Sequence, residues 1–112
     1  VQAEASRLGA TILLKGNIDV ISDGARTRFN WTGNPGMTVG GTGDVLSGVT
    51  VGFMAMDFSP FESAVAGAFI NGSAGDSAFK EKGYHLLPTD LIERIPKVIQ
   101  EAISGKMRAG KF

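Results

Sequence analysis

The chain has 112 residues, and its eleven basic and eleven acidic side chains give a formal net charge of zero. This length fits one domain or part of one, and the balanced charge argues against a surface for nucleic acid or an anionic membrane. There are no cysteines and one histidine, which excludes disulfides and thiolate sites, so no protein metal site is predicted. No stretch resembles a signal peptide or a membrane span, which predicts a cytoplasmic protein.

The first elements predicted are a helix and a strand. Residues 2–8 read as the end of a helix that stops at Gly9, and because the chain starts inside this pattern at Val1, we expect a partial chain. Residues 11–14 form a short, continuous apolar run. Such a run predicts a strand that is buried on both faces, as in a sheet covered by helices.

Two further strands are predicted on either side of a turn at Asp23 and Gly24. Residues 18–23 alternate weakly and residues 26–31 clearly between polar and apolar, which favours an antiparallel hairpin at the edge of a sheet. One face of the second strand carries Arg26, Arg28 and Asn30, and the other carries Thr27, Phe29 and Trp31. Trp31 is expected to pack rather than to recognise a ligand.

Residues 34–48 carry the strongest functional signal, because glycines at 36, 40, 41 and 43 crowd a turn that leads into an apolar helical run. These glycines permit positive φ and close approach of a ligand, while Thr42 offers a hydroxyl at the helix-cap position. The first amides of a helix lack intrahelical partners and lie at the positive end of its dipole. A phosphate group is therefore the expected ligand.

Asp44 lies beside this expected anion site. A carboxylate repels a bound phosphate, so Asp44 is favoured as a base that removes the proton from a hydroxyl attacking that phosphate. The alternative is that it only complements the helix dipole. Lys15 also has two interpretations, a phosphate contact at a strand end or a solvated lysine, and its own sequence surroundings favour the second.

Two helices are predicted after the turn. Residues 45–56 are apolar nearly all round, which predicts a buried helix in which Gly48 and Gly52 permit close approach to the sheet. A second helix is expected to start at Ser59 or Pro60 and to have a core-facing apolar pattern.

The polar segment at 71–76 in that second helix has two interpretations. Either Asn71 and the nearby backbone border a ligand pocket, or the helix loosens near its end. His85, which follows in a loop, is expected to be a packing or surface residue.

A last helix is predicted from the capping-box spacing of Asp90 and Glu93. Pro96 is expected to kink this helix, and residues 106–112 are expected to have no regular structure. The predicted apolar stripe consists of Leu91, Ile92, Ile95, Ile99, Ala102 and Ile103.

Five motifs of the chain occur together in one family. They are Leu14-Lys15-Gly16 continuing to Asp19, Asn34-Pro35-Gly36-Met37, Gly40-Gly41-Thr42-Gly43-Asp44, residues 68–76, and residues 86–91. Over nearly its whole length the chain resembles the C-terminal part of the ADP- or ATP-dependent NAD(P)H-hydrate dehydratases of the ribokinase-like superfamily. The resemblance implies an α/β fold, with residues 1–112 as the C-terminal portion of a ribokinase-like domain and a sheet with an antiparallel edge hairpin covered by helices.

The same resemblance implies a carbon-oxygen lyase of metabolite repair, which removes water from hydrated NADH or NADPH while ADP or ATP is hydrolysed. The nucleotide would carry Mg²⁺. The implied nucleotide contacts are Lys15, Gly16, Asn17, Ile18, Asp19, Gly41, Thr42 and Gly43. Asp44 would be the catalytic base and would face the hydrated ring, and Asn71 would contact the substrate. A homo-oligomer is implied, with the remaining N-terminal half or an epimerase as further partners.

The chain departs from the family pattern at two places. Asn71 stands where many relatives have histidine, and residues 17–19 lack the small or hydroxylated side chains often found there, which leaves the choice between ADP and ATP open. The N-terminal half that supplies much of the family's sheet and substrate pocket is expected to be missing. A ribokinase-like kinase for a vitamin precursor and a non-catalytic nucleotide-binding module therefore remain alternatives.

Overall fold

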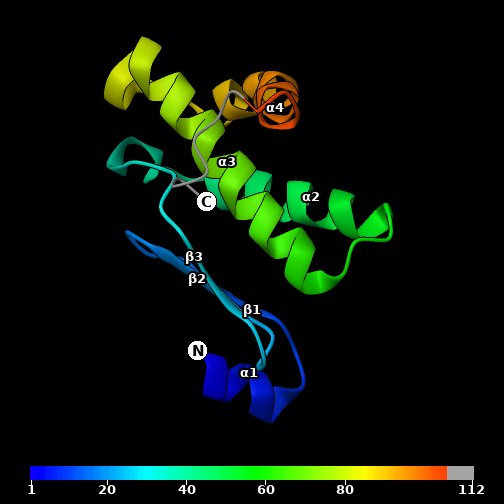
Figure 1. Cartoon of the computed structure of the whole chain (residues 1–112). Helices are drawn as coiled ribbons and strands as arrows, with labels where there is room; N and C mark the ends of the chain where they lie inside the picture. Colours follow the sequence, from blue (N-terminus) through cyan, green and yellow to red (C-terminus); the bar gives the residue numbers. More distant parts are fainter. Residues whose placement is uncertain (106–112) are drawn as a thin grey trace.

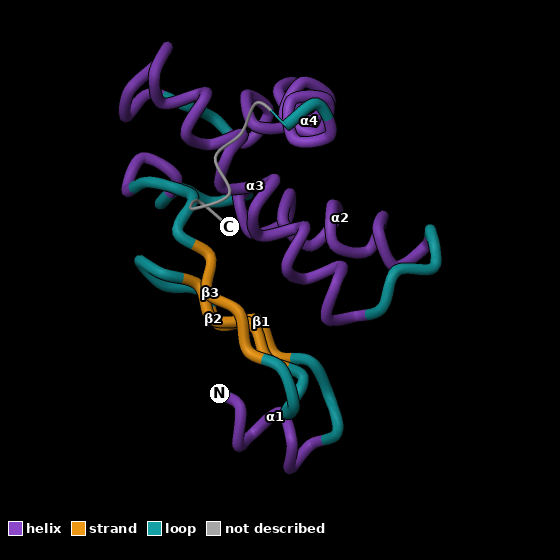
Figure 2. The backbone as a smooth tube through the Cα atoms, viewed as in Figure 1, coloured by secondary structure: helices purple, strands orange, loops and turns teal. Residues whose placement is uncertain are grey.

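The structure is a computed structural model that describes residues 1–105, so the tail expected to lack structure at 106–112 lies outside the described residues. A three-stranded antiparallel sheet, ordered β1-β2-β3, lies beside a layer of helices (Figures 1 and 2). The α/β class and the helix-covered antiparallel hairpin are confirmed. The elements are α1 (Gln2–Leu8), β1 (Ile12–Leu14), β2 (Asp19–Ser22), β3 (Thr27–Asn30), the 3-10 turn η1 (Pro35–Met37), α2 (Thr42–Ala55), α3 (Pro60–Lys82), the 3-10 turn η2 (Gly83–His85) and α4 (Pro88–Ile103).

The predicted hairpin and its turn are confirmed. Strand β2 pairs with β3 from Asp19 opposite Asn30 to Ser22 opposite Thr27. The carboxylate of Asp23 closes the turn by accepting the backbone N–H of its third neighbour Arg26 at 2.7 Å. This bond, with further hydrogen bonds from the Ala25 amide and the Arg26 guanidinium, lowers the pKa of Asp23 to about 2.

One face of the sheet is covered by α3 with α2 beside it (Figure 1). Ile21 is fully buried on this inner face, in a cluster with Leu46 of α2 and with Phe61 and Ala68 of α3. Asn30 is also buried there, and its Nδ2 donates to the carbonyl of Ala68 at 3.1 Å. The inner face of β3 is therefore its polar one.

The outer face of the sheet carries apolar residues, among them Leu14, which was expected to be buried. Val20 pairs with both Leu14 and Phe29, so the three side chains share this face. Leu14 is 53% exposed, Phe29 50% and Trp31 56%. The predictions of a first strand buried on both faces and of a packed Trp31 are therefore wrong for the described chain, because α2 and α3 cover one face, while the short helix α1 lies on the other side, at the end of the hairpin turn (Figure 1).

The glycines of α2 do not have the predicted packing role. A Cβ at Gly48 or Gly52 would meet no atom within 4 Å. Val45 and Leu46 are buried, whereas Val51 is 62% exposed. The helix predicted to be buried all round is therefore open on one side.

The tight contacts belong to glycines of α3 instead. A Cβ at Gly72 would lie 2.7 Å from the backbone carbon of Thr32, and a Cβ at Gly75 would lie 2.7 Å from the methyl carbon of Met37. These positions let the segment that follows β3 lie directly on the helix. The helix starts as predicted, with a capping box between Ser59 and Glu62.

The last helix starts two residues before the predicted cap. Pro88 is its first residue and Asp90 its third, and the Asp90 carboxylate reaches back to accept the N–H of Leu87 at 2.7 Å. Asp90 therefore caps the helix from inside it rather than from the N-cap position. This contact, with an ion pair from Lys82, lowers the pKa of Asp90.

The buried apolar stripe of α4 is also narrower than predicted. Leu91 and Val98 are buried against α3, while Ile92 is 53% and Ile103 82% exposed. The helix continues through Pro96, and His85 is exposed as expected. No helix within residues 1–105 has the length and apolar composition needed to cross a membrane.

Candidate functional site

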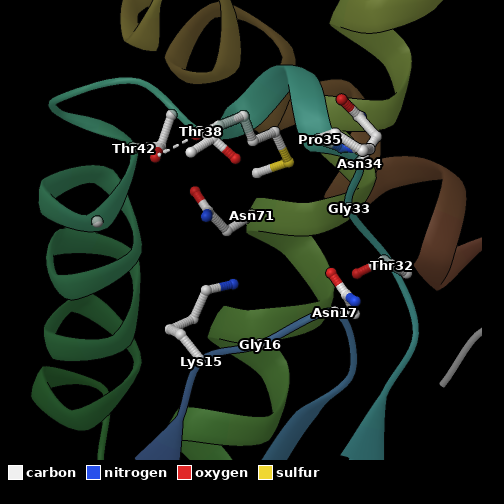
Figure 3. Close-up of a pocket in the computed structure, with 12 residues that line it drawn as sticks. Lys15, Gly16, Asn17, Thr32, Gly33, Asn34, Pro35, Thr38, Thr42 and Asn71 are labelled. Carbon is white, nitrogen blue, oxygen red and sulfur yellow. Dashed lines mark hydrogen bonds between the residues drawn. The ribbon is translucent and has the colours of Figure 1, made fainter.

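A polar pocket of about 700 Å³ opens where the end of β1, the N-terminus of α2 and the middle of α3 meet (Figure 3). Six predicted site residues line it, namely Lys15, Gly16, Asn17, Thr42, Gly43 and Asn71. They come from segments far apart in the sequence. The structure thus brings the lysine-bearing strand end, the glycine-rich turn and the polar part of α3 to one place.

The glycine-rich turn forms the N-terminus of α2. Gly41 is the N-cap residue with φ of 106°, and a Cβ there would lie 2.7 Å from the Pro88 ring, so only glycine fits. The first intrahelical bond runs from the Val45 N–H to the Gly41 carbonyl. The amides of Thr42, Gly43 and Asp44 precede it and form no hydrogen bond within the described residues.

The hydroxyl of Thr42 has a different role from the predicted helix cap. It donates to the carbonyl of Met37 at 2.9 Å and to that of Val39 at 3.2 Å. It therefore holds the loop before the helix and leaves the first amides open. Such amides, at the positive end of the helix dipole, are suited to an anion.

Asp19 supports the side of the pocket that residues 15–17 form. It is 1% exposed, and its carboxylate accepts the Gly16 N–H at 3.2 Å and the Asn30 Nδ2 at 2.9 Å. Lys15 Nζ lies 3.1 Å from the same carboxylate, while the lysine side chain is 52% exposed. Asp19 thus holds the turn that presents Lys15 and the Gly16 backbone to the pocket.

Asn71 points into the pocket from α3, toward the side of Thr42 and Lys15 (Figure 3). Its side chain is 2% exposed, and its Oδ1 has no hydrogen-bond partner among residues 1–105. Because a buried amide without a partner is costly, a ligand that donates to this oxygen would stabilise the site. The helix continues to Lys82, so the prediction of a loosened helix is wrong. Asn71 lines the pocket, and its contact with a ligand stays a prediction.

Asp44 lies in the first turn of α2 and is exposed. Four residues that were predicted for the site are not among those lining the pocket, namely Gly41, Asp44, Ile18 and Asp19. Asp44 nevertheless follows directly after Gly43, which does line the pocket. Its expected role as the base stays a prediction.

The far wall of the pocket was not predicted as part of the site. It consists of Thr32, Gly33, Asn34, Pro35, Met37 and Thr38, which connect β3 to the glycine-rich turn. The Asn34-Pro35-Gly36-Met37 motif was a signal for it, since this segment carries the family resemblance. Sequence alone does not place a loop on a particular helix.

The fold and the pocket define the chain as an α/β segment of the ribokinase-like kind, with a glycine-rich helix N-terminus beside a polar pocket. A solved ribokinase-like superfamily protein from Enterococcus faecalis is 37% identical and matches with a TM-score of 0.77, over 89% of this chain and 35% of its own. The ADP/ATP-dependent NAD(P)H-hydrate dehydratase from Bacillus subtilis, co-crystallised with ATP and Mg²⁺ and soaked with CoA, is 29% identical. Its TM-score is 0.82, over 89% of this chain and 38% of its own.

Residues 1–97 match the family described as NAD(P)H-hydrate dehydratase, and the chain belongs to that family. It is 53% identical to the bifunctional NAD(P)H-hydrate repair enzyme of Pyrobaculum aerophilum, over 89% of this chain and 20% of that protein. It is 54% identical to the ADP-dependent (S)-NAD(P)H-hydrate dehydratase of Cenarchaeum symbiosum, over 89% of this chain and 35% of that protein. The chain therefore spans between a fifth and about a third of the length of these curated relatives.

Proposed function

We propose that the protein removes water from hydrated NADH or NADPH while ADP or ATP is hydrolysed, a carbon-oxygen lyase reaction of metabolite repair in the cytoplasm. The supporting observation is the pocket, in which the open amides at the start of α2 lie across from Lys15 and the buried, unpartnered Asn71. The family membership and the names of the relatives support the same reaction.

In this proposal the chain has three working parts. Residues 15–17 and the amides of Thr42 and Gly43 bind the nucleotide phosphates, and these amides stabilise charge on the transferred phosphoryl group. Asp44 takes the proton from the ring hydroxyl, whose oxygen bonds to phosphorus as the bond to the leaving nucleotide breaks. Phosphate then leaves with that oxygen, the neighbouring ring carbon loses a proton, and the ring double bond forms between the two carbons. Asn71 holds the substrate through its amide.

The Bacillus relative was co-crystallised with Mg²⁺. Within residues 1–105, no three or more His, Cys, Asp or Glu side chains gather in a way that could hold a metal ion. The described chain therefore does not fit a protein-held cation. Mg²⁺ in this proposal would arrive with the nucleotide phosphates, as is usual for this small, hard ion.

The test is recovery of NADH absorbance from its hydrate, with release of free phosphate, in the presence of ADP or ATP. Asp44→Asn is expected to lower the rate by at least ~100-fold, since general base catalysis typically contributes 10²–10⁴-fold, while ADP binding persists. Asp57→Asn is the matched control, because it removes a carboxylate from the loop after α2, away from the pocket residues. Undiminished turnover in Asp44→Asn would refute the assigned base, and a stable phosphorylated product would indicate a small-molecule kinase.

A second candidate is a non-catalytic nucleotide-binding module, which is favoured by the absence of Asp44, the expected base, from the described residues that line the pocket. Calorimetry of the 112-residue chain with ADP separates the candidates. Binding without turnover supports the module, and turnover supports the dehydratase.

Some relatives are named as bifunctional repair enzymes, so we also propose the remaining N-terminal half or an epimerase as a partner.

A further inference from the structure

The carboxylate of Asp76 on α3 joins the far wall of the pocket to the helix behind it. Its Oδ2 accepts the backbone N–H of Gly33 at 3.2 Å, and its Oδ1 accepts Nδ2 of Asn34 at 2.9 Å. Gly33 and Asn34 both line the pocket, whereas Asp76 does not. Each carboxylate oxygen thus holds a different group of the same wall.

The wall segment also lies closely on α3 at the positions around Asp76. Gly72 leaves room for Thr32 and Gly75 leaves room for Met37, and a Cβ at either glycine would come within 3 Å of these partners. Gly33 adopts φ of 109°, a conformation that favours glycine. Its amide direction is therefore set by the backbone, and Asp76 is placed to accept from it.

The same segment continues to the amides that are proposed to bind phosphate. Met37 ends η1, and its carbonyl accepts the hydroxyl of Thr42 in the first turn of α2. A chain of contacts thus runs from Asp76 through the wall to the N-terminus of α2. A shift of the wall would move both sides of the pocket opening.

We infer that Asp76 is a positioning residue, which fixes residues 33–37 as the pocket wall and thereby sets the place of the glycine-rich turn. It acts through Gly33 and Asn34 and does not touch the ligand. The effect on nucleotide affinity rests on the proposed function, whereas the effect on the wall does not. Two measurements separate these claims.

The first measurement needs no ligand. Amide hydrogen exchange of Gly33 is followed by NMR in the 112-residue chain, in Asp76→Ala and in the control Ser77→Ala, which changes the exposed neighbour on the same helix. Asp76→Ala is expected to speed exchange at Gly33 at least tenfold relative to the amides of α3, and Ser77→Ala to leave it unchanged. Equal exchange at Gly33 in all three would overturn the inference. If Asp76→Ala does not fold, Asp76→Asn, which keeps one acceptor oxygen, replaces it with a smaller effect expected.

The second measurement is ADP affinity by calorimetry in a double-mutant cycle of Asp76→Ala and Asn34→Ala. We expect each change to weaken ADP binding about tenfold and the pair to weaken it little further, because both disrupt the same contact. A general loss of folding would instead lower the melting temperature and add across the cycle, and additive losses would count against positioning through Asn34. If the unchanged chain does not bind ADP, the nucleotide function fails, and exchange at Gly33 alone decides the role of Asp76.

Discussion

Asp19 and Lys15 form an ion pair in which the two partners have opposite surroundings. The carboxylate is almost fully buried, while half of the lysine side chain is exposed in the pocket. Asp19 also accepts from Gly16 and Asn30, so its charge is balanced by hydrogen bonds whether or not the lysine stays. Lys15 is therefore available to an incoming phosphate, and Asp19 is bound to the fold.

Substitutions of the two partners are expected to separate stability from binding. Asp19→Asn leaves buried donors without a charged acceptor and should lower the free energy of unfolding by about 2–4 kcal/mol. Lys15→Met should change it by about 1 kcal/mol or less, since the lysine is half exposed, yet weaken ADP binding about tenfold or more. Thermal unfolding and ADP calorimetry on both variants check this. If neither variant loses ADP affinity, the role of the β1 end in nucleotide binding is contradicted.

At the scale of elements, helices α2 and α3 use their glycines in opposite ways. Gly48 and Gly52 of α2 face open space, whereas Gly72 of α3 touches the backbone of Thr32 and so allows the wall segment to approach. A glycine in a helix interior has the same local cost wherever it lies. Its benefit depends on what lies against it.

This difference predicts opposite effects of the same substitution. Gly48→Ala should stabilise the chain by about 0.5–1 kcal/mol through helix propensity. Gly72→Ala should destabilise it by about 1–3 kcal/mol, because the new methyl group would displace Thr32. Denaturant unfolding of the two variants measures both. Equal effects would show that the wall segment does not lie on α3 as described.

At the scale of the whole molecule, α2 and α3 cover one side of the sheet, and α1 lies on the other side only at the hairpin turn. Leu14, Phe29 and Trp31 are each about half exposed on or beside the outer face. Apolar side chains gathered in this way favour association more than the same residues scattered singly. We expect such a face to be covered, either by a further part of the family's domain or by a second copy of this chain.

We expect the 112-residue chain to self-associate as its concentration rises, with Trp31 as the reporter because it is the single tryptophan. Acrylamide should quench its fluorescence readily in dilute solution and less as oligomers form. Sedimentation equilibrium gives the mass in parallel, and Phe29→Glu should weaken association by placing a charge on the same face. A mass of 11.7 kDa at every concentration would contradict the prediction.

Local sequence determined the elements of this protein and the chemistry of its turn. The three strands, the hairpin about Asp23, the helix start at Ser59 and the glycine-rich N-terminus of α2 all follow from turn residues, caps and periodicity, which depend on near neighbours. The family motifs added the expected partners of the turn, of which Lys15 and Asn71 line the pocket.

Only the tertiary structure decided which surfaces are inside. Alternation in β3 separates Phe29 from Asn30 but is symmetric between the two faces, so it could not show that α3 covers the polar one. Helical spacing likewise could not show that Gly72 packs and Gly48 does not. The pocket wall held by Asp76 depends on contacts between residues that lie 42 or 43 positions apart in the sequence. Burial is a property of the elements that come together, whereas periodicity is a property of each element alone.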